Sequence, residues 1–198
     1  MSLGGSRYFV TFIDDYTRHT WACLVAKKSK VFVCFLKVKS LVKREIGHKL
    51  KFLSYDGGKE CFFDQFSSYL QKEGIRREFS CRYTPMQNGV AEQRSWTIEE
   101  VAQAMLEEKH MLKFYWAEAV RLAVYLQNQT STNGGVSPHE LYFGKKPNLA
   151  HLRVFGSIAY VHMPEEKQKN LDAKVKKCIL VNYSDEQKGY NCYSPRTK

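Results

Sequence analysis

The sequence lacks the patterns that identify zinc-binding, membrane-spanning and secreted proteins. Its six cysteines contain no C-x-x-C pair and form no zinc-ligand pattern with the six histidines. No apolar run approaches the length of a membrane span, and the N-terminal residues lack the charged region and apolar stretch of a signal peptide. We therefore expect free thiols in a reducing compartment, without zinc-finger or membrane-protein character.

Positive charge is abundant, and it is unevenly placed. The formal net charge is +11 over 198 residues. Residues 27–51 carry nine lysines or arginines and one acid, and residues 145–198 carry eleven against five acids. Two basic blocks around a slightly acidic middle suit a polyanion binder, but they equally suit a soluble basic surface. Charge alone leaves both interpretations open.

Hydrophobic patterning predicts a mixed α/β part followed by an all-β part. Apolar, β-branched runs predict strands over residues 8–13, 21–26, 49–55 and 75–80. Helical periodicity predicts helices over residues 31–46, 64–72, 89–109 and 113–129. The turn-rich stretch STNGGVSP then separates this part from the C-terminal residues. These residues contain three short strand-like runs, whose regular spacing predicts a small β-barrel or meander.

Two carboxylates occupy positions that suit a shared site. Asp56 follows a predicted strand and precedes Gly57-Gly58, and Glu92 lies in the first turn of the predicted long helix. Each has an ordinary explanation, because Asp is common in turns and an acid at a helix start complements the helix dipole. The 35 residues between them are enough to bring the two side chains together, where they could bind divalent cations for phosphodiester chemistry. That chemistry normally requires a third carboxylate.

The motifs and their order resemble the integrase region of a copia-type LTR retrotransposon Pol polyprotein. The matching stretches are YFVTFIDDYTRHTW, DGGKE, YTPMQNGVAE, FYWAEAV, LRVFGSIAYVH and CILVNYS, which together cover nearly the whole chain. WAEAV and VFGSIAYVH narrow the resemblance to the copia branch. The resemblance implies an α/β, ribonuclease-H-like mixed sheet flanked by helices over residues 1–145, missing its first strand. A small all-β barrel of the Src-homology type would follow over residues 146–198.

The resemblance also implies a reaction, namely 3′-end processing and strand transfer of retrotransposon DNA into host DNA. In this family an Asp, Asp, Glu triad binds two Mg²⁺ or Mn²⁺ ions. Asp56 matches the second catalytic and metal-binding residue, and Glu92 matches the third. The enzyme class would be a DDE-type nucleotidyltransferase and endonuclease.

The expected partners are DNA, both the retrotransposon ends and the host target, and further copies of the chain; no membrane partner is expected. Gln87, Asn88 and Gly89 match the mobile active-site loop that contacts DNA, and Arg94 keeps one further positive charge for DNA. The family's role implies action in the nucleus, after synthesis in the cytoplasm as part of a polyprotein.

Several departures from the family lead us to expect an inactive chain. The family's first aspartate lies on the strand before YFVTFIDDY, so we expect an N-terminally truncated chain without it. Asp14 and Asp15 match the following turn, where we expect them to pair with Arg18 or cap the hairpin. Ser95 and Trp96 stand where the family usually has asparagine and basic residues. The alternatives are a non-catalytic nucleic-acid-binding remnant, an interaction protein, or a different ribonuclease-H-like nuclease.

Overall fold

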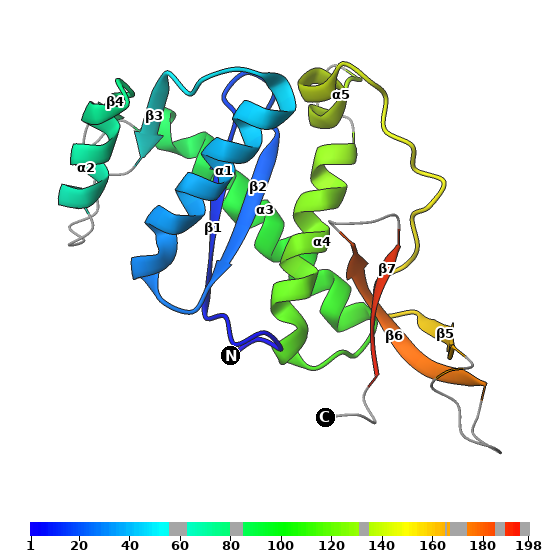
Figure 1. Ribbon diagram of the computed structural model, residues 1–198. Coiled ribbons are helices and arrows are strands. Elements are labelled where there is room, and N and C mark those ends of the chain that lie inside the picture. The colour runs from blue at the N-terminus through cyan, green and yellow to red at the C-terminus, as the bar shows by residue number, and fades with distance from the viewer. Residues whose placement is uncertain are drawn as a thin grey trace.

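The computed structural model describes residues 1–55, 63–79, 85–130, 135–164, 166, 174–184 and 189–194. For residues 63–65, 78, 79 and 85–88 it describes the backbone only. The described strands form two two-stranded sheets and one three-stranded sheet, which Figure 1 shows with their helices.

The first sheet is a hairpin packed between helices. β1 (Tyr8–Ile13) pairs antiparallel with β2 (Thr20–Val25). On one face, Phe12 meets Phe35 of α1 (Val31–Ile46), with 6.3 Å between the ring centroids. On the other face, Phe9 and Leu24 join the core formed with α3 (Pro85–Glu108) and α4 (Trp116–Gln129). A short 3₁₀ turn (Lys28–Lys30) leads into α1, which ends at Gly47 in the left-handed conformation.

The second sheet is parallel and does not join the first among the described strands. β3 (Phe52–Tyr55) and β4 (Arg76–Phe79) are linked through α2 (Phe63–Lys72). Leu70 and Ile75 form a second buried cluster with Phe35, and Phe12 packs against it. Helix α1 therefore spans both sheets, as Figure 1 shows. This part of the chain is therefore mixed α/β, as predicted.

Helix α4 carries the largest part of the core. Ala119, Val120 and Ala123 are buried, as their helical spacing predicts. Near its end, Asn128 accepts a hydrogen bond from the Thr20 N–H (2.9 Å) and donates one to the Thr20 carbonyl (2.8 Å). The buried Asn128 side chain therefore bonds to the Thr20 backbone as the backbone of a neighbouring strand would, and this fixes α4 against β2.

A short helix, α5 (Pro138–Phe143), was not predicted. The Ser137 hydroxyl accepts a hydrogen bond from the Glu140 N–H at 3.1 Å, and Pro138 occupies the first helical turn. Ser, Pro and Glu in this spacing form a recognisable helix start that could have predicted it.

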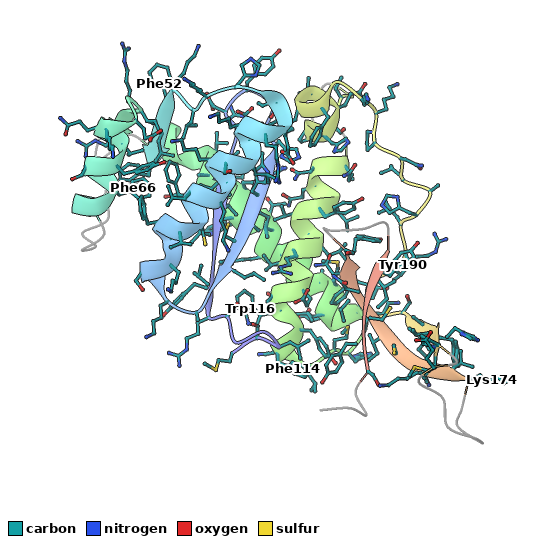
Figure 2. All side chains as sticks on the ribbon, viewed as in Figure 1. Phe52, Phe66, Phe114, Trp116, Lys174 and Tyr190 are labelled. Atoms are coloured by element: carbon teal, nitrogen blue, oxygen red, sulfur yellow. The ribbon has the colours of Figure 1, made fainter. Side chains whose placement is uncertain are left out.

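The C-terminal part is an antiparallel sheet of β5 (Ile158–His162), β6 (Val175–Tyr183) and β7 (Tyr190–Tyr193). Val181 and Tyr183 join the same core as α4. A second 3₁₀ turn, Lys113–Tyr115, precedes α4, and the Tyr115 ring meets Tyr193 of β7 at 5.5 Å. In Figure 2, Phe114 and Trp116 lie near this junction, and Lys174 marks the far end of the sheet.

Four of the six cysteines lie within the described residues. Cys23, Cys34, Cys178 and Cys192 are free thiols, and Cys61 and Cys81 lie outside the described residues. In the described part of the chain, every helix is too short or too polar to span a bilayer.

Candidate functional site

Glu92 is exposed on α3, further along the helix than its sequence context predicts. The helix begins at Pro85, so that Glu92 lies about two turns inside it and its first turn contains no acid. The expected helix start near Gly89 is therefore wrong, and so is the interpretation of Glu92 as an acid that complements the helix dipole. Pro85 suits the first helical position, because its fixed φ is helical and its missing N–H has no intrahelical partner there.

The earlier start of α3 also changes the conformation expected for the DNA-contacting segment. Gln87, Asn88 and Gly89 lie in the first turns of α3, not in a loop before it. The side chains of Gln87 and Asn88 lie outside the description. A Cβ added at Gly89 would meet no atom within 4 Å, so the helix is uncrowded on that side.

Two residues after Glu92 fasten α3 to the hairpin. Arg94 donates from Nε to the Thr20 hydroxyl at 3.3 Å, and the Ser95 and Thr11 hydroxyls are 3.4 Å apart. Burial lowers the pKa of Arg94, and its Nη2 is buried without a hydrogen-bond partner among the described residues. Arg94 thus directs its Nε group toward the hairpin, and its contact with DNA stays a prediction.

The residues that depart from the family therefore divide into two kinds. Ser95, which lacks the usual amide, serves as a contact between helix and hairpin. Trp96 is 72% exposed, so its large ring is presented to solvent on α3 close to Glu92. Burial of Arg94 could not be predicted from sequence, because helical spacing does not show which side of Glu92 meets the sheet.

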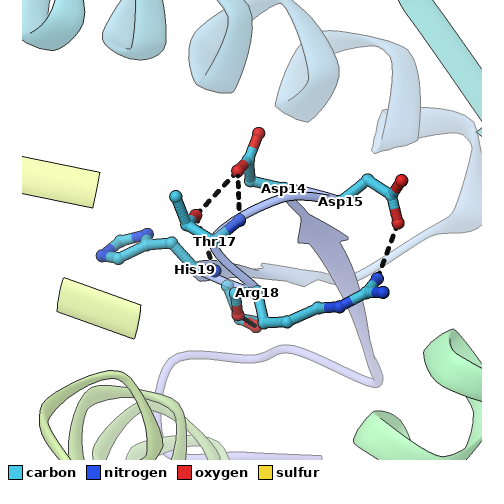
Figure 3. Close-up of polar contacts among 6 residues, drawn as sticks. Asp14, Asp15, Thr17, Arg18 and His19 are labelled. Carbon is cyan, nitrogen blue, oxygen red and sulfur yellow. Dashed lines mark hydrogen bonds and ion pairs between the residues drawn. The ribbon is translucent and has the colours of Figure 1, made fainter. Parts of the chain in front are cut away.

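Asp14 and Asp15 have local structural roles, as predicted (Figure 3). The Asp14 carboxylate accepts hydrogen bonds from the Thr17 N–H at 2.9 Å and the Thr17 hydroxyl at 2.7 Å. Asp15 forms an exposed ion pair with Arg18, at 2.6 Å. Both acids therefore stabilise the turn that joins β1 to β2, and neither is presented as a substitute for a third catalytic acid.

A buried aromatic and polar cluster lies beside this turn. His19 stacks on Tyr142 of α5 with 4.5 Å between ring centroids, and Trp21 contacts both rings, at 4.8 Å from His19 and 5.3 Å from Tyr142. Burial, together with nearby His139, lowers the pKa of His19 to about 4. The cluster therefore holds a neutral imidazole at neutral pH. Nothing in the local sequence around His19 predicts this.

The described residues do not by themselves make a two-ion metal site. Asp56 lies outside them, although it directly follows the end of β3 at Tyr55. Within the described ranges, no three His, Cys, Asp or Glu side chains gather closely enough to hold a metal ion. Glu92 contributes one carboxylate, whereas Mg²⁺ is bound by several oxygens in octahedral geometry. No catalytic step can be derived through a metal from this donor set.

A cavity of about 970 Å³ lies elsewhere, between the start of β1, α3 and the start of α4. Its walls include Phe9, Leu106 and Trp116, and its rim includes Glu99 and Lys113. Neither Glu92 nor Arg94 lines it, so this cavity is not part of the candidate site.

Comparison with solved structures defines the class of the fold. A chain of the simian T-cell lymphotropic virus intasome, solved in complex with the PP2A regulatory subunit B56 gamma, matches with a TM-score of 0.58 at 12% identity. The match covers 93% of this chain and 69% of that one. The HTLV-2 integrase catalytic core domain, solved with magnesium in a dimeric form, matches with a TM-score of 0.51 at 18% identity. This second match covers 67% of this chain and 81% of that one. The fold of the chain is therefore of the class found in integrase catalytic cores.

Comparison with sequences defines the family. The Retroviral polymerase SH3-like domain matches residues 157–198. The Retrovirus-related Pol polyprotein from transposon TNT 1-94 of Nicotiana tabacum is 40% identical over 100% of this chain. The corresponding polyprotein from transposon RE2 of Arabidopsis thaliana is 34% identical over 97% of it. The chain belongs to these retrovirus-related Pol polyproteins of copia-type transposons. It spans 15% of the length of the tobacco polyprotein and 13% of the Arabidopsis one.

Proposed function

We propose that the chain is an integrase segment that binds retrotransposon and target DNA and that, as given, does not complete strand transfer. The general integration role follows from its family. The observation that supports the specific proposal is the placement of Glu92, which is exposed on α3 while Arg94 and Ser95 fasten the same helix to the hairpin. An exposed carboxylate on an anchored helix is available as one oxygen ligand for a divalent cation, and such a cation could bind a phosphodiester.

The proposed acidic pair is Asp56 and Glu92, with Gln87, Asn88 and Gly89 near the bound DNA. A bound Mg²⁺ or Mn²⁺ ion would supply activation of the attacking oxygen and stabilisation of the leaving oxygen. We expect the pair to be insufficient, because two ions carry more positive charge than two carboxylates balance. Asp14 and Asp15 cannot replace the family's first aspartate without giving up their contacts with Thr17 and Arg18.

Strand transfer of a labelled DNA end into a plasmid, with Mn²⁺, tests this proposal. We expect no joined product from the chain, from Asp56→Asn or from Glu92→Gln. Joined product from the unaltered chain that disappears in Asp56→Asn would contradict the proposed inactivity and would assign Asp56 to a working site. Asp14→Asn is the matched control, since loss of product in that variant would mean that a turn acid completes the site.

A second candidate function is DNA binding without catalysis, and the surface of α1 favours it. Lys37, Lys43 and Arg44 are exposed on this helix, and Lys49 and Lys51 are exposed just beyond it. Glu45 is the only acid within the basic block of residues 27–51, and it accepts a hydrogen bond from Tyr142. A row of exposed cations with so little opposing charge suits contact with phosphates.

A further inference from the structure

β5 is an edge strand among the strands that the structure describes. It pairs with β6 on one side, and no described strand pairs with its other side. Figure 1 places β5 on the outside of the C-terminal sheet, away from α1 and the hairpin. An open edge presents a row of backbone donors and acceptors to which an extended chain can bind.

The hydrogen bonds to β6 identify which backbone groups face outward. The Leu180 N–H donates to the Ser157 carbonyl, and the Met163 N–H donates to the Lys174 carbonyl, each at 2.9 Å. In an antiparallel pair, bonded residues alternate with residues whose backbone groups point to the other side. The β5 residues that direct their N–H and C=O groups to the open edge are therefore Ile158, Tyr160 and His162.

The side chains along this edge are apolar and exposed. Tyr160 is 71% exposed and Ile158 is 57% exposed, and Val175, opposite His162 on β6, is 48% exposed. The strand sequence IAYVH contains no proline and no lysine, glutamate, aspartate or arginine. Natural edge strands usually carry such residues to prevent pairing, so β5 lacks the protection expected of an edge that remains unpaired.

The charge beside the edge selects the kind of partner. Lys177 lies directly opposite Tyr160, and Lys174 and Lys176 flank it along β6. The described residues 157–163 and 174–184 contain no acid. A second copy of this chain would bring the same lysines to the contact, whereas an acidic segment would be attracted to them. Ile158 and Val175 favour a peptide over a nucleic acid, because they offer apolar contacts and no charge to a phosphate.

We propose that β5 binds an extended, acidic polypeptide segment, which adds a fourth strand to the described sheet. Backbone hydrogen bonds to Ile158, Tyr160 and His162 would provide most of the affinity. Apolar side chains of the segment would cover Ile158 and Tyr160, and its acids would pair with Lys177. This mode of binding is strand addition, in which alternate side chains determine specificity.

The probe is a short fluorescein-labelled peptide that alternates valine and glutamate, measured by fluorescence anisotropy with the full chain. We expect saturable binding, and we expect Tyr160→Pro to weaken it about tenfold or more by removing an outward N–H and disfavouring pairing at the edge. Tyr160→Thr is the matched control, because it removes the ring but keeps the N–H and a strand-forming residue. It should bind more tightly than Tyr160→Pro.

A second variant does not depend on how well the strand tolerates proline. Lys177→Glu changes an exposed side chain, so we expect the unfolding midpoint to stay unchanged while binding of the acidic peptide weakens. The same variant should bind a valine–lysine peptide more tightly than the unaltered chain does. Opposite shifts for the two peptides would support the proposed charge pairing.

Four results would overturn the proposal. One is the absence of saturable peptide binding to the unaltered chain, and another is equal binding by Tyr160→Pro and Tyr160→Thr. The third is a sedimentation experiment in which the chain is a dimer that Tyr160→Pro converts to monomer, because a second copy would then occupy the edge. Displacement of the peptide by single-stranded DNA, with loss of DNA binding in Lys177→Glu, would assign the surface to nucleic acid instead.

Discussion

His19 shows how a single buried side chain makes the stability of this protein depend on pH. The residue is 7% exposed and packs against both Trp21 and Tyr142, which also contact each other. Burial and His139 lower its pKa, as does Arg94, while Asp14 acts in the opposite direction. The folded protein therefore takes up the His19 proton only near pH 4, whereas the unfolded chain takes it up near pH 6.5. The associated stability is present above pH 6.5 and is lost as the pH falls toward 4.

We expect this residue to contribute about 3 kcal/mol to the loss of unfolding free energy between pH 7 and pH 4. His19→Phe keeps an aromatic ring in the stack and removes the titration, so its stability should fall much less over this range. Urea denaturation at several pH values measures the difference. His110→Phe, a change at an exposed histidine on the turn after α3, is the control. Parallel pH curves for the unaltered chain and His19→Phe would contradict the expectation.

At the scale of residues, sequence predicted local roles better than tertiary ones. The turn roles of Asp14 and Asp15 were predictable because their partners, Thr17 and Arg18, lie within three positions. The burial of Arg94 and His19 was not, because it depends on the packing of α3 and α5 against the hairpin. The roles of Asp56 and Glu92 in catalysis remain predictions.

At the scale of elements, the start of α3 offers a direct test of its helical conformation. Gly89 lies inside the helix without a positive φ, and a Cβ there would meet nothing within 4 Å. We therefore expect Gly89→Ala to stabilise the protein by about 0.5–1 kcal/mol, since alanine loses less backbone entropy on folding. Thermal or urea unfolding measures this change.

Gly144 provides the matched control for that substitution. It also has open space around a hypothetical Cβ, but it ends α5 with φ of 68°. Gly144→Ala should therefore destabilise the protein by about 1 kcal/mol through left-handed strain alone. If Gly89→Ala destabilises by a similar amount, the Gly89 segment is not helical, and the loop expected from the family resemblance would be correct.

The periodic elements were predicted closely and the irregular boundaries were not. Helix α1 was predicted at its observed bounds, because its apolar positions recur at helical spacing and Gly47 ends it. The start of α3 was misplaced by four residues, since Gly89 was interpreted as a helix boundary although helices tolerate an isolated glycine. The division of the described strands into a β1–β2 sheet and a β3–β4 sheet was not predicted, because strand runs alone do not specify their neighbours.

At the scale of the whole molecule, positive charge and exposed apolar surface lie on different parts of the fold. The first basic block lies along α1 and the segment that follows it, over the mixed α/β part. The apolar edge at β5 lies in the SH3-like part, beside its own smaller set of lysines. The two proposals therefore depend on separate surfaces, and variants of one should leave binding at the other unchanged.

DNA affinity across a salt series tests the contribution of α1. Each lysine or arginine that neutralises a phosphate adds about 0.9 to the slope of log affinity against log salt. We expect the double variant Lys43→Gln and Arg44→Gln to reduce this slope by about 2, equally for unrelated DNA sequences.

Lys39→Gln is the matched control on the same helix, because the Lys39 ammonium already pairs with Glu73 at 2.5 Å and bonds Tyr69 at 2.9 Å. An equal loss of slope in the control would mean that general charge, and not the exposed surface of α1, attracts the DNA. A slope near zero for the unaltered chain would contradict DNA binding by either basic block.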